Sequence, residues 1–202
     1  MTTSTTSLSS SLEGSRTATR LPDIAIVGKA GAGKTTAAEH LHCRHGYLRV
    51  SFANILKDVA ATIWGPEART DRDKLQRLGV AVREIDQDAW VNAARRTIEG
   101  PGYGKRGFPI VVDDCRFPNE YWMLKELGFR FLRVHASETL RVDRLQRNGK
   151  LQDISQLNHV SETAIDDTKD FPVDHNIWNE GLRLLDYQIA IDSVLNKELS
   201  RS

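Results

Sequence analysis

Short apolar runs alternate along the 202-residue chain with longer segments in which apolar residues recur every three or four positions. Runs of the first kind have the length of strands, and the second pattern is typical of amphipathic helices. Strands are expected at residues 23–27, 47–51, 109–114, 129–136 and 175–179. Helices are expected at residues 35–45, 52–64, 72–82, 88–99, within 117–128, at 138–147 and at 182–199. This alternation predicts an α/β domain whose parallel sheet carries helices on both faces.

Composition and charge narrow the class of protein. Hydrophobic residues make up 40% of the chain and charged residues 27%, and the net charge is +1, so no overall charge attracts nucleic acid or an acidic membrane. The first twenty residues are rich in Ser and Thr and predict a disordered tail before a single domain at 21–202. The two cysteines are far apart, and no apolar run reaches the length of a membrane span, so a soluble, reduced, cytoplasmic protein is expected.

The most specific local signal is the sequence GKAGAGKT at residues 28–35. It satisfies G-x-x-x-x-G-K-[ST], follows an expected strand and opens an expected helix, which is the setting of a phosphate-binding P-loop. Glycines allow backbone N–H groups to surround phosphate oxygens, Lys34 would neutralise them, and the Thr35 hydroxyl would bind Mg²⁺. The expected ATP phosphate-binding residues are Gly28, Ala30, Gly31, Ala32, Gly33, Lys34, Thr35 and Thr36.

A pair of acids at the end of the third expected strand offers a second part of the site. Asp113 and Asp114 stand where a carboxylate could reach Mg²⁺, although adjacent side chains on a strand point opposite ways. No N-K-x-D follows a later strand, which argues against a regulatory GTPase. A small chain with arginines spread around the P-loop suits a kinase that acts on a small phosphorylated acceptor.

Four further motifs follow the P-loop in order: RDKLQRLGVAVREIDQDAW (72–90), DCRFPNE (114–120), NHVSE (158–162) and NIWNEG (176–181). In these the chain resembles the deoxynucleoside monophosphate kinases of tailed bacteriophages. The resemblance implies ATP-dependent phosphorylation of deoxynucleoside monophosphates to diphosphates for phage DNA synthesis, in the host cytoplasm. It also implies a three-layer P-loop fold with a parallel five-stranded sheet, a helical acceptor-binding region at about 52–105 and a lid at about 138–160. It places Asp114 at the acidic strand end, with Mg²⁺, and Arg116 and Glu120 near the acceptor.

Arginines are the expected tools of phosphoryl transfer, because a guanidinium binds phosphate oxygens bidentately and keeps its charge. Arg141, Arg144 and Arg147 recur every third residue on one expected helix, so with Lys34 they are the catalytic candidates. The alternative is a solvated helix face paired with Glu138 and Asp143.

The acceptor pocket is expected to draw on the region between residues 52 and 105. Arg83 is the candidate for the acceptor phosphate and Gln76 for the base edge or sugar. Phe52 and Trp90 could stack on the base, with core packing at least as good an explanation for each. Asn179 and Gly181, after the last strand, are expected on the adenine side.

Other interpretations stay open at this point. The fold would equally serve a kinase for another phosphorylated acceptor, of phosphomevalonate or dephospho-cofactor type, or an ATP-binding switch without a small acceptor. The expected partner is a small molecule, not nucleic acid or a membrane, with a homodimer left open. The stretch HLHCRH (40–45) holds possible zinc ligands, but on a helix they diverge and no second cluster completes a set, so no zinc site is expected.

Overall fold

The computed structural model describes residues 20–103, 107–149 and 171–201. The strands are β1 (Ile24–Val27), β2 (Leu48–Val50), β3 (Ile110–Val112), β4 (Arg130–His135) and β5 (His175–Trp178). The helices are α1 (Lys34–His45), α2 (Phe52–Trp64), the 3₁₀ turn η1 (Pro66–Arg69), α3 (Arg72–Ile85), α4 (Ala89–Glu99), α5 (Pro118–Glu126), α6 (Glu138–Arg147) and α8 (Leu184–Leu199). Within these ranges no helix has the length and apolar character needed to cross a membrane.

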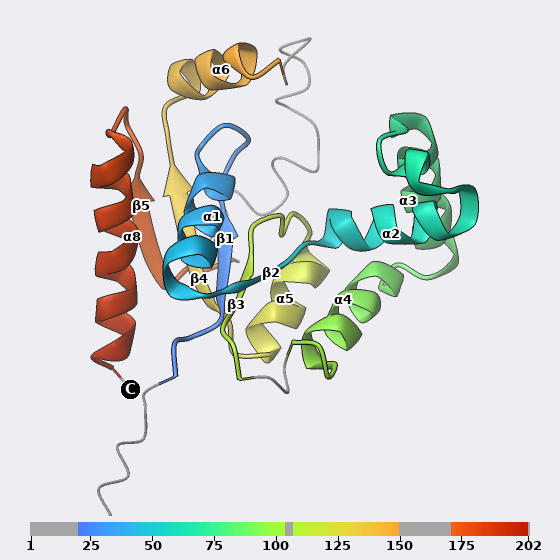
Figure 1. Cartoon of the computed structure of the whole chain (residues 1–202), viewed down its shortest axis with the longest axis horizontal. Coiled ribbons are helices and arrows are strands. Elements are labelled where there is room, and N and C mark those ends of the chain that lie inside the picture. Colours follow the sequence, from blue (N-terminus) through green and yellow to red (C-terminus); the bar gives the residue numbers. More distant parts are fainter. Residues whose placement is uncertain (1–19, 104–106, 150–170, 202) are drawn as a thin grey trace, which may run out of the picture.

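The five strands form one parallel sheet in the order β2-β3-β1-β4-β5. Helices α1 and α8 cover one face, and α4 and α5 lie toward the other (Figure 1). Side chains of β1 alternate between the two layers: Ala25 and Val27 join the core under α4 and α5, while Ile24 and Ile26 join the core under α1 and α8. The predicted three-layer α/β fold with a five-stranded parallel sheet is confirmed. Strand β1 is apolar at every position because both of its faces are buried.

Helix ends follow local chemistry. Gly46 ends α1 in the left-handed conformation, at φ 73°, and its N–H bonds to the carbonyl of His42. The Ser51 and Asp71 side chains accept hydrogen bonds from the backbones of Asn54 and Lys74, which caps the N-termini of α2 and α3. These caps fix where α2 and α3 begin. Helices α2, α3 and α4 form a helical lobe, which projects from the β2 side of the sheet (Figure 1).

Three differences from the sequence expectation exceed a shift of a residue or two at an element end, or change where a site residue lies. Helix α3 continues to Ile85 because Arg83 and Glu84 are good helix formers, although the apolar pattern weakens there. A short 3₁₀ turn, Pro66–Arg69, occupies a segment interpreted only as a break. Strand β3 stops at Val112, so the two acids that follow it belong to a loop.

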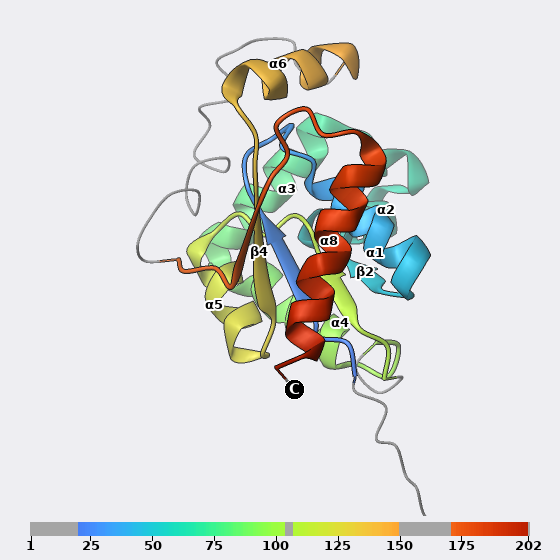
Figure 2. The ribbon, with the colours of Figure 1, turned by 90° about the vertical axis from the view of Figure 1, so that its left-hand side faces the viewer.

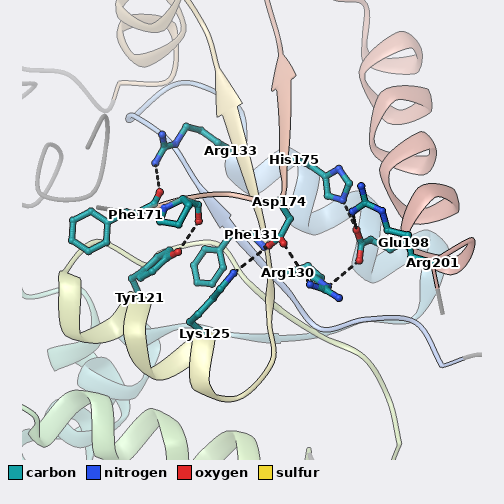
Figure 3. Close-up of polar contacts among 11 residues, drawn as sticks. Tyr121, Lys125, Arg130, Phe131, Arg133, Phe171, Asp174, His175, Glu198 and Arg201 are labelled. Carbon is teal, nitrogen blue, oxygen red and sulfur yellow. Dashed lines mark hydrogen bonds and ion pairs between the residues drawn. The ribbon is translucent and has the colours of Figure 1, made fainter. Parts of the chain in front are cut away.

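The C-terminal helix is fixed to the sheet by a buried carboxylate. Glu198 is 3% exposed, and its oxygens lie 2.6 Å from His175 Nε2, 3.0 Å from Arg130 Nε and 2.9 Å from Arg201 Nη1 (Figure 3). The nearby Asp174 carboxylate accepts a hydrogen bond of 2.8 Å from the backbone of Phe131. These contacts hold α8 against β4 and β5, and Figure 2 shows the helix lying along that face of the sheet.

Candidate active site

The P-loop between β1 and α1 is packed so tightly that none of its three glycines can carry a side chain: a Cβ on Gly31, at φ +80°, would lie 2.7 Å from the carbonyl oxygen of Arg141. A Cβ on Gly28, at φ +135°, would lie 2.3 Å from the carbonyl oxygen of Val134. A Cβ on Gly33, at φ +116°, would lie 2.5 Å from Nδ2 of Asn179. Both the backbone conformation and the close contacts therefore require glycine at these positions. The resulting turn leads directly into the N-terminus of α1, where N–H groups favour an anion.

Two buried side chains from the C-terminal part of the chain support the P-loop from behind. The Asn179 amide donates a hydrogen bond of 2.8 Å to the carbonyl of Ala32. The Tyr187 hydroxyl, on α8, donates one of 3.1 Å to the carbonyl of Gly33. Burial raises the pKa of Tyr187 well above its ordinary value, so the hydroxyl keeps its proton and remains a donor. From the sequence, Asn179 is expected beside adenine and Tyr187 has no expected role.

Helix α6 brings two of the three expected arginines onto the P-loop. Arg141 is 6% exposed, and its guanidinium donates a hydrogen bond of 3.2 Å to the carbonyl of Ala30. Arg144 donates to the carbonyls of Gly31, at 3.2 Å, and Ala32, at 3.3 Å. Both guanidinium groups thus hold carbonyls of the P-loop, and Arg144 also lines the cleft beside the loop. Figure 1 shows α6 crossing above the loop.

The third arginine of the helix does not share this position. Arg147 is 77% exposed and pairs with Asp143 at 2.9 Å, which is the solvated arrangement that the sequence analysis gave as the alternative. The rest of the expected lid, residues 150–160, lies outside the described residues.

Lys34 turns back onto its own loop in this structure. Its ammonium group donates hydrogen bonds to the carbonyl oxygens of Gly28 and of Lys29, the latter at 3.1 Å. Neutral carbonyls are weaker partners than phosphate oxygens, so an arriving phosphate can replace them. Thr35 and Thr36 line the cleft beside it.

The two acids after β3 are both engaged at the same cleft. The Asp114 carboxylate accepts hydrogen bonds from the Ser51 hydroxyl at 2.6 Å and from the backbones of Phe52 at 3.1 Å and Ala53 at 2.9 Å. Burial raises the pKa of Asp114, and these three hydrogen bonds oppose the rise. Asp114 therefore fixes the start of α2, a contact that the sequence analysis did not anticipate.

Asp113 lies next to it and pairs with Arg49 at 3.2 Å. Asp113, Asp114 and Thr35 border one cleft, and hard oxygen ligands of this kind fit Mg²⁺.

The cleft has a volume of about 840 Å³ and joins the P-loop to the start of α2. This volume lies in the range of small-molecule sites. Besides P-loop residues, its lining includes basic side chains that the sequence analysis did not select, Arg49 and Lys57, together with the expected Arg116. Arg49 pairs with Glu39 at 2.8 Å and with Asp113 at 3.2 Å, so the positive charge on the side facing α2 comes from Lys57 and Arg116.

Several expected acceptor residues do not line this cleft. Phe52 and Trp90 are buried in the core, at 8% and 6% exposure, and the Trp90 indole donates a hydrogen bond of 3.3 Å to the carbonyl of Gly79. Core packing, the alternative considered for both, describes their place here. The Arg83 guanidinium lies over the Phe117 ring, 4.8 Å from its centroid.

The Glu120 carboxylate also does not line the cleft, and it bonds to backbone N–H groups instead. It is 3% exposed, and its carboxylate accepts hydrogen bonds from the N–H groups of Arg116 at 2.7 Å and Phe117 at 3.1 Å. Burial raises the pKa of Glu120 to about 7, against the effect of these hydrogen bonds. Glu120 caps α5 and so positions Arg116. Gln76 lies on the exposed side of α3, and Gly181, at φ +72°, turns the chain after β5.

The sequence of the chain matches a known protein family over most of its length. Residues 24–165 match the profile of AAA_18, an AAA domain family. The chain belongs to this family. The match covers the P-loop, the helical lobe, both acids and α6. It therefore accounts for the elements that form the cleft, except for Asn179 and Leu182 after β5 and the residues contributed by α8.

Solved structures agree on the fold. The chain resembles a gluconokinase from Sinorhizobium meliloti, with a TM-score of 0.54, 14% identity and coverage of 91% of this chain and 98% of that one. It also resembles a shikimate kinase from Acinetobacter baumannii, with a TM-score of 0.53, 14% identity and coverage of 89% and 96%. The fold is that of P-loop kinases.

One curated relative is a protein of Acanthamoeba polyphaga mimivirus that carries the name of a candidate deoxynucleotide monophosphate kinase. It is 27% identical over an alignment of 139 positions, with coverage of 55% of this chain and 72% of the relative.

Proposed function

We propose that this protein transfers the γ-phosphate of ATP to a deoxynucleoside monophosphate. The observation that carries the proposal is the cleft, which has one end formed by the P-loop and the other bordered by Arg49, Lys57 and Arg116. A phosphoryl donor and an anionic acceptor could meet there, because each end offers positive charge to a phosphate. The name of the mimivirus relative supports a nucleotide as the acceptor.

The residues divide by their place in the cleft. The P-loop backbone, Lys34 and Arg144 would hold the ATP phosphates, with Arg141 fixing the loop from α6. Mg²⁺, when bound, would neutralise phosphate charge, with Thr35 and the Asp113–Asp114 pair as the oxygen donors available to it. Arg116 and Lys57 would hold the acceptor phosphate. Phosphoryl transfer needs such positioning and charge neutralisation more than acid–base chemistry.

The direct test is a coupled assay of ADP release with Mg²⁺-ATP. Candidate acceptors are dTMP, dGMP, dCMP, dAMP and the ribonucleotides, with shikimate and gluconate as acceptors of the structural relatives. ADP release that depends on a deoxynucleoside monophosphate and is lost in Lys34→Ala would support the proposal. Turnover with shikimate or gluconate and with no nucleotide would show that the acceptor is not a deoxynucleoside monophosphate. ADP release at the same rate with every acceptor would show that the protein is not a kinase for any of them.

The acceptor end can be tested separately. Lys57→Ala should raise the KM for the acceptor by about tenfold or more, the equivalent of about 1.4 kcal/mol for a lost charge-assisted contact. The KM for ATP should stay within about twofold. Lys125→Ala is a matched control, since this lysine lies on α5 and pairs with Asp174 at 3.8 Å, away from the cleft. An equal change in the KM for ATP and the KM for the acceptor would contradict the assignment of Lys57 to the acceptor phosphate.

A further inference from the structure

A cluster of metal-binding side chains lies outside the cleft, where α1 packs against α8. His40 and His45 come from α1, and Asp192 comes from α8, about 150 residues further along the chain. One carboxylate oxygen of Asp192 lies 2.7 Å from Nε2 of His40 and 2.7 Å from Nε2 of His45. The ligand atoms of all three residues lie within 4.8 Å of one another.

We propose that His40, His45 and Asp192 bind a transition-metal ion of the Zn²⁺ class. Two imidazole nitrogens and a carboxylate oxygen are the donors that Zn²⁺ takes, and a site with three protein ligands leaves a fourth position for water. The sequence analysis expected no zinc site because α1 alone cannot complete a ligand set. The fold supplies the missing ligand from α8.

Binding an ion requires side-chain rotation of the three ligands. Donor atoms about 2.0–2.1 Å from a tetrahedral zinc are about 3.3 Å apart. The two nitrogen–oxygen separations of 2.7 Å would widen by about 0.6 Å, and the two imidazole nitrogens, which lie within 4.8 Å of each other, would take the same spacing. Both imidazoles already direct Nε2 to the same oxygen, so the ion would take the place of the protons that these nitrogens share with Asp192.

Charge and burial suit a cation at this point. The His40 side chain is 9% exposed, that of His45 24% and that of Asp192 36%, so the site is partly shielded from water and open on one side. The Asp192 carboxylate, placed between the two imidazoles, offers the negative charge that a divalent ion needs.

Cys43 is adjacent in the sequence and does not belong to the set. Its thiol donates a hydrogen bond of 3.3 Å to the Glu39 carboxylate, and its sulfur is not among the ligand atoms that lie within 4.8 Å of one another. The three-residue set of His40, His45 and Asp192 is therefore the proposed site.

A bound ion would join two helices that both reach the P-loop. Helix α1 begins at Lys34, and α8 carries Tyr187, whose hydroxyl bonds to Gly33. The ion would thus stabilise the layer that supports the P-loop without entering the cleft. This inference does not depend on the proposed phosphoryl transfer, and it can be tested in the absence of nucleotide.

The experiment is a zinc titration of the full chain after removal of metal with a chelator and removal of the chelator. Isothermal titration calorimetry should show one saturable Zn²⁺ site in the wild type, and differential scanning calorimetry should show a higher Tm with Zn²⁺. His45→Gln and Asp192→Asn should each weaken binding by tenfold or more and lose the rise in Tm. Asp192→Asn keeps the shape and the hydrogen-bonding oxygen while removing the charge, so it retains the fold.

Two control variants make the result specific. His42→Gln changes a histidine of the same helix whose Nδ1 lies 2.6 Å from the carbonyl of Tyr47, and Cys43→Ser removes the neighbouring thiol. Both should bind Zn²⁺ as the wild type does. The proposal is overturned if the wild type shows no stoichiometric binding, if Asp192→Asn binds with unchanged affinity, or if binding disappears in His42→Gln or Cys43→Ser.

Discussion

The side chain of Asn179 offers the sharpest test of how the P-loop is held. It is 5% exposed, its amide donates to Ala32 at 2.8 Å, and its oxygen accepts a hydrogen bond of 3.2 Å from Arg144. Asn179→Ala removes both contacts. The neutral hydrogen bond contributes about 1 kcal/mol. The second contributes about another 1 kcal/mol, less than is usual for a charged donor, because Arg144 keeps its bonds to backbone carbonyls.

The expected loss is therefore about 2 kcal/mol in the free energy of unfolding, or about 4–8 °C in Tm for a domain of this size. Urea denaturation measures the first quantity and calorimetry the second. An ATP analogue should also bind more weakly, because it must then order a loop that the wild type presents already ordered. A tenfold increase in Kd would correspond to about 1.4 kcal/mol of that ordering.

Asn176→Ala is the matched control. Asn176 is the same residue type and lies on β5, three residues before Asn179, but its side chain is exposed and bonds only to the ring of His135 at 2.8 Å among the contacts seen in the described residues. Its substitution should cost less than about 0.5 kcal/mol and leave nucleotide affinity unchanged. If Asn179→Ala is no more destabilising than Asn176→Ala, the support that we assign to Asn179 is wrong.

Two carboxylates away from the P-loop give further predictions. Glu198→Gln should lower the free energy of unfolding by about 2 kcal/mol, because it leaves His175 without its charged partner while the arginines nearby can turn to water. Urea denaturation measures this loss, with Glu180→Gln as an exposed control. Equal stabilities of the two variants would contradict the prediction. Glu120 has a pKa of about 7 in the fold, above its usual 4.5, so its contribution to stability is complete below pH 4.5 and is lost as the pH rises through 7. Relative to the wild type, Glu120→Gln should therefore gain up to about 3 kcal/mol between about pH 4.5 and about pH 8, and parallel stability curves for the two proteins over that range would refute the burial argument.

The sequence predicts the parts of this fold that depend on local pattern. The run IAIV of β1 is apolar at every position because both of its faces are covered, and the glycines and Lys34 of the P-loop sit directly after it. Short caps such as Gly46 are equally local. Strand order, by contrast, is not predicted, because periodicity does not say which strands are neighbours; the order β2-β3-β1-β4-β5 comes from the structure.

Side-chain partners that are distant in sequence could not be predicted in this way. Tyr187 looks like one more apolar position of the last helix, yet its hydroxyl reaches Gly33 from 154 residues away. Asp192 looks like a surface acid, yet it meets two histidines of α1. Trp90 was assigned to base stacking or core by its type alone, and only packing distinguishes the two.

The proposed phosphoryl transfer is tested most directly by following the phosphate itself. The protein would be incubated with Mg²⁺ and ATP labelled at the γ-phosphate, together with each deoxynucleoside monophosphate in turn, and the products separated. The account predicts label in the corresponding deoxynucleoside diphosphate, with little in inorganic phosphate, and none in the diphosphate for Lys34→Ala. Label found only in inorganic phosphate, at a rate independent of the added monophosphate, would contradict it.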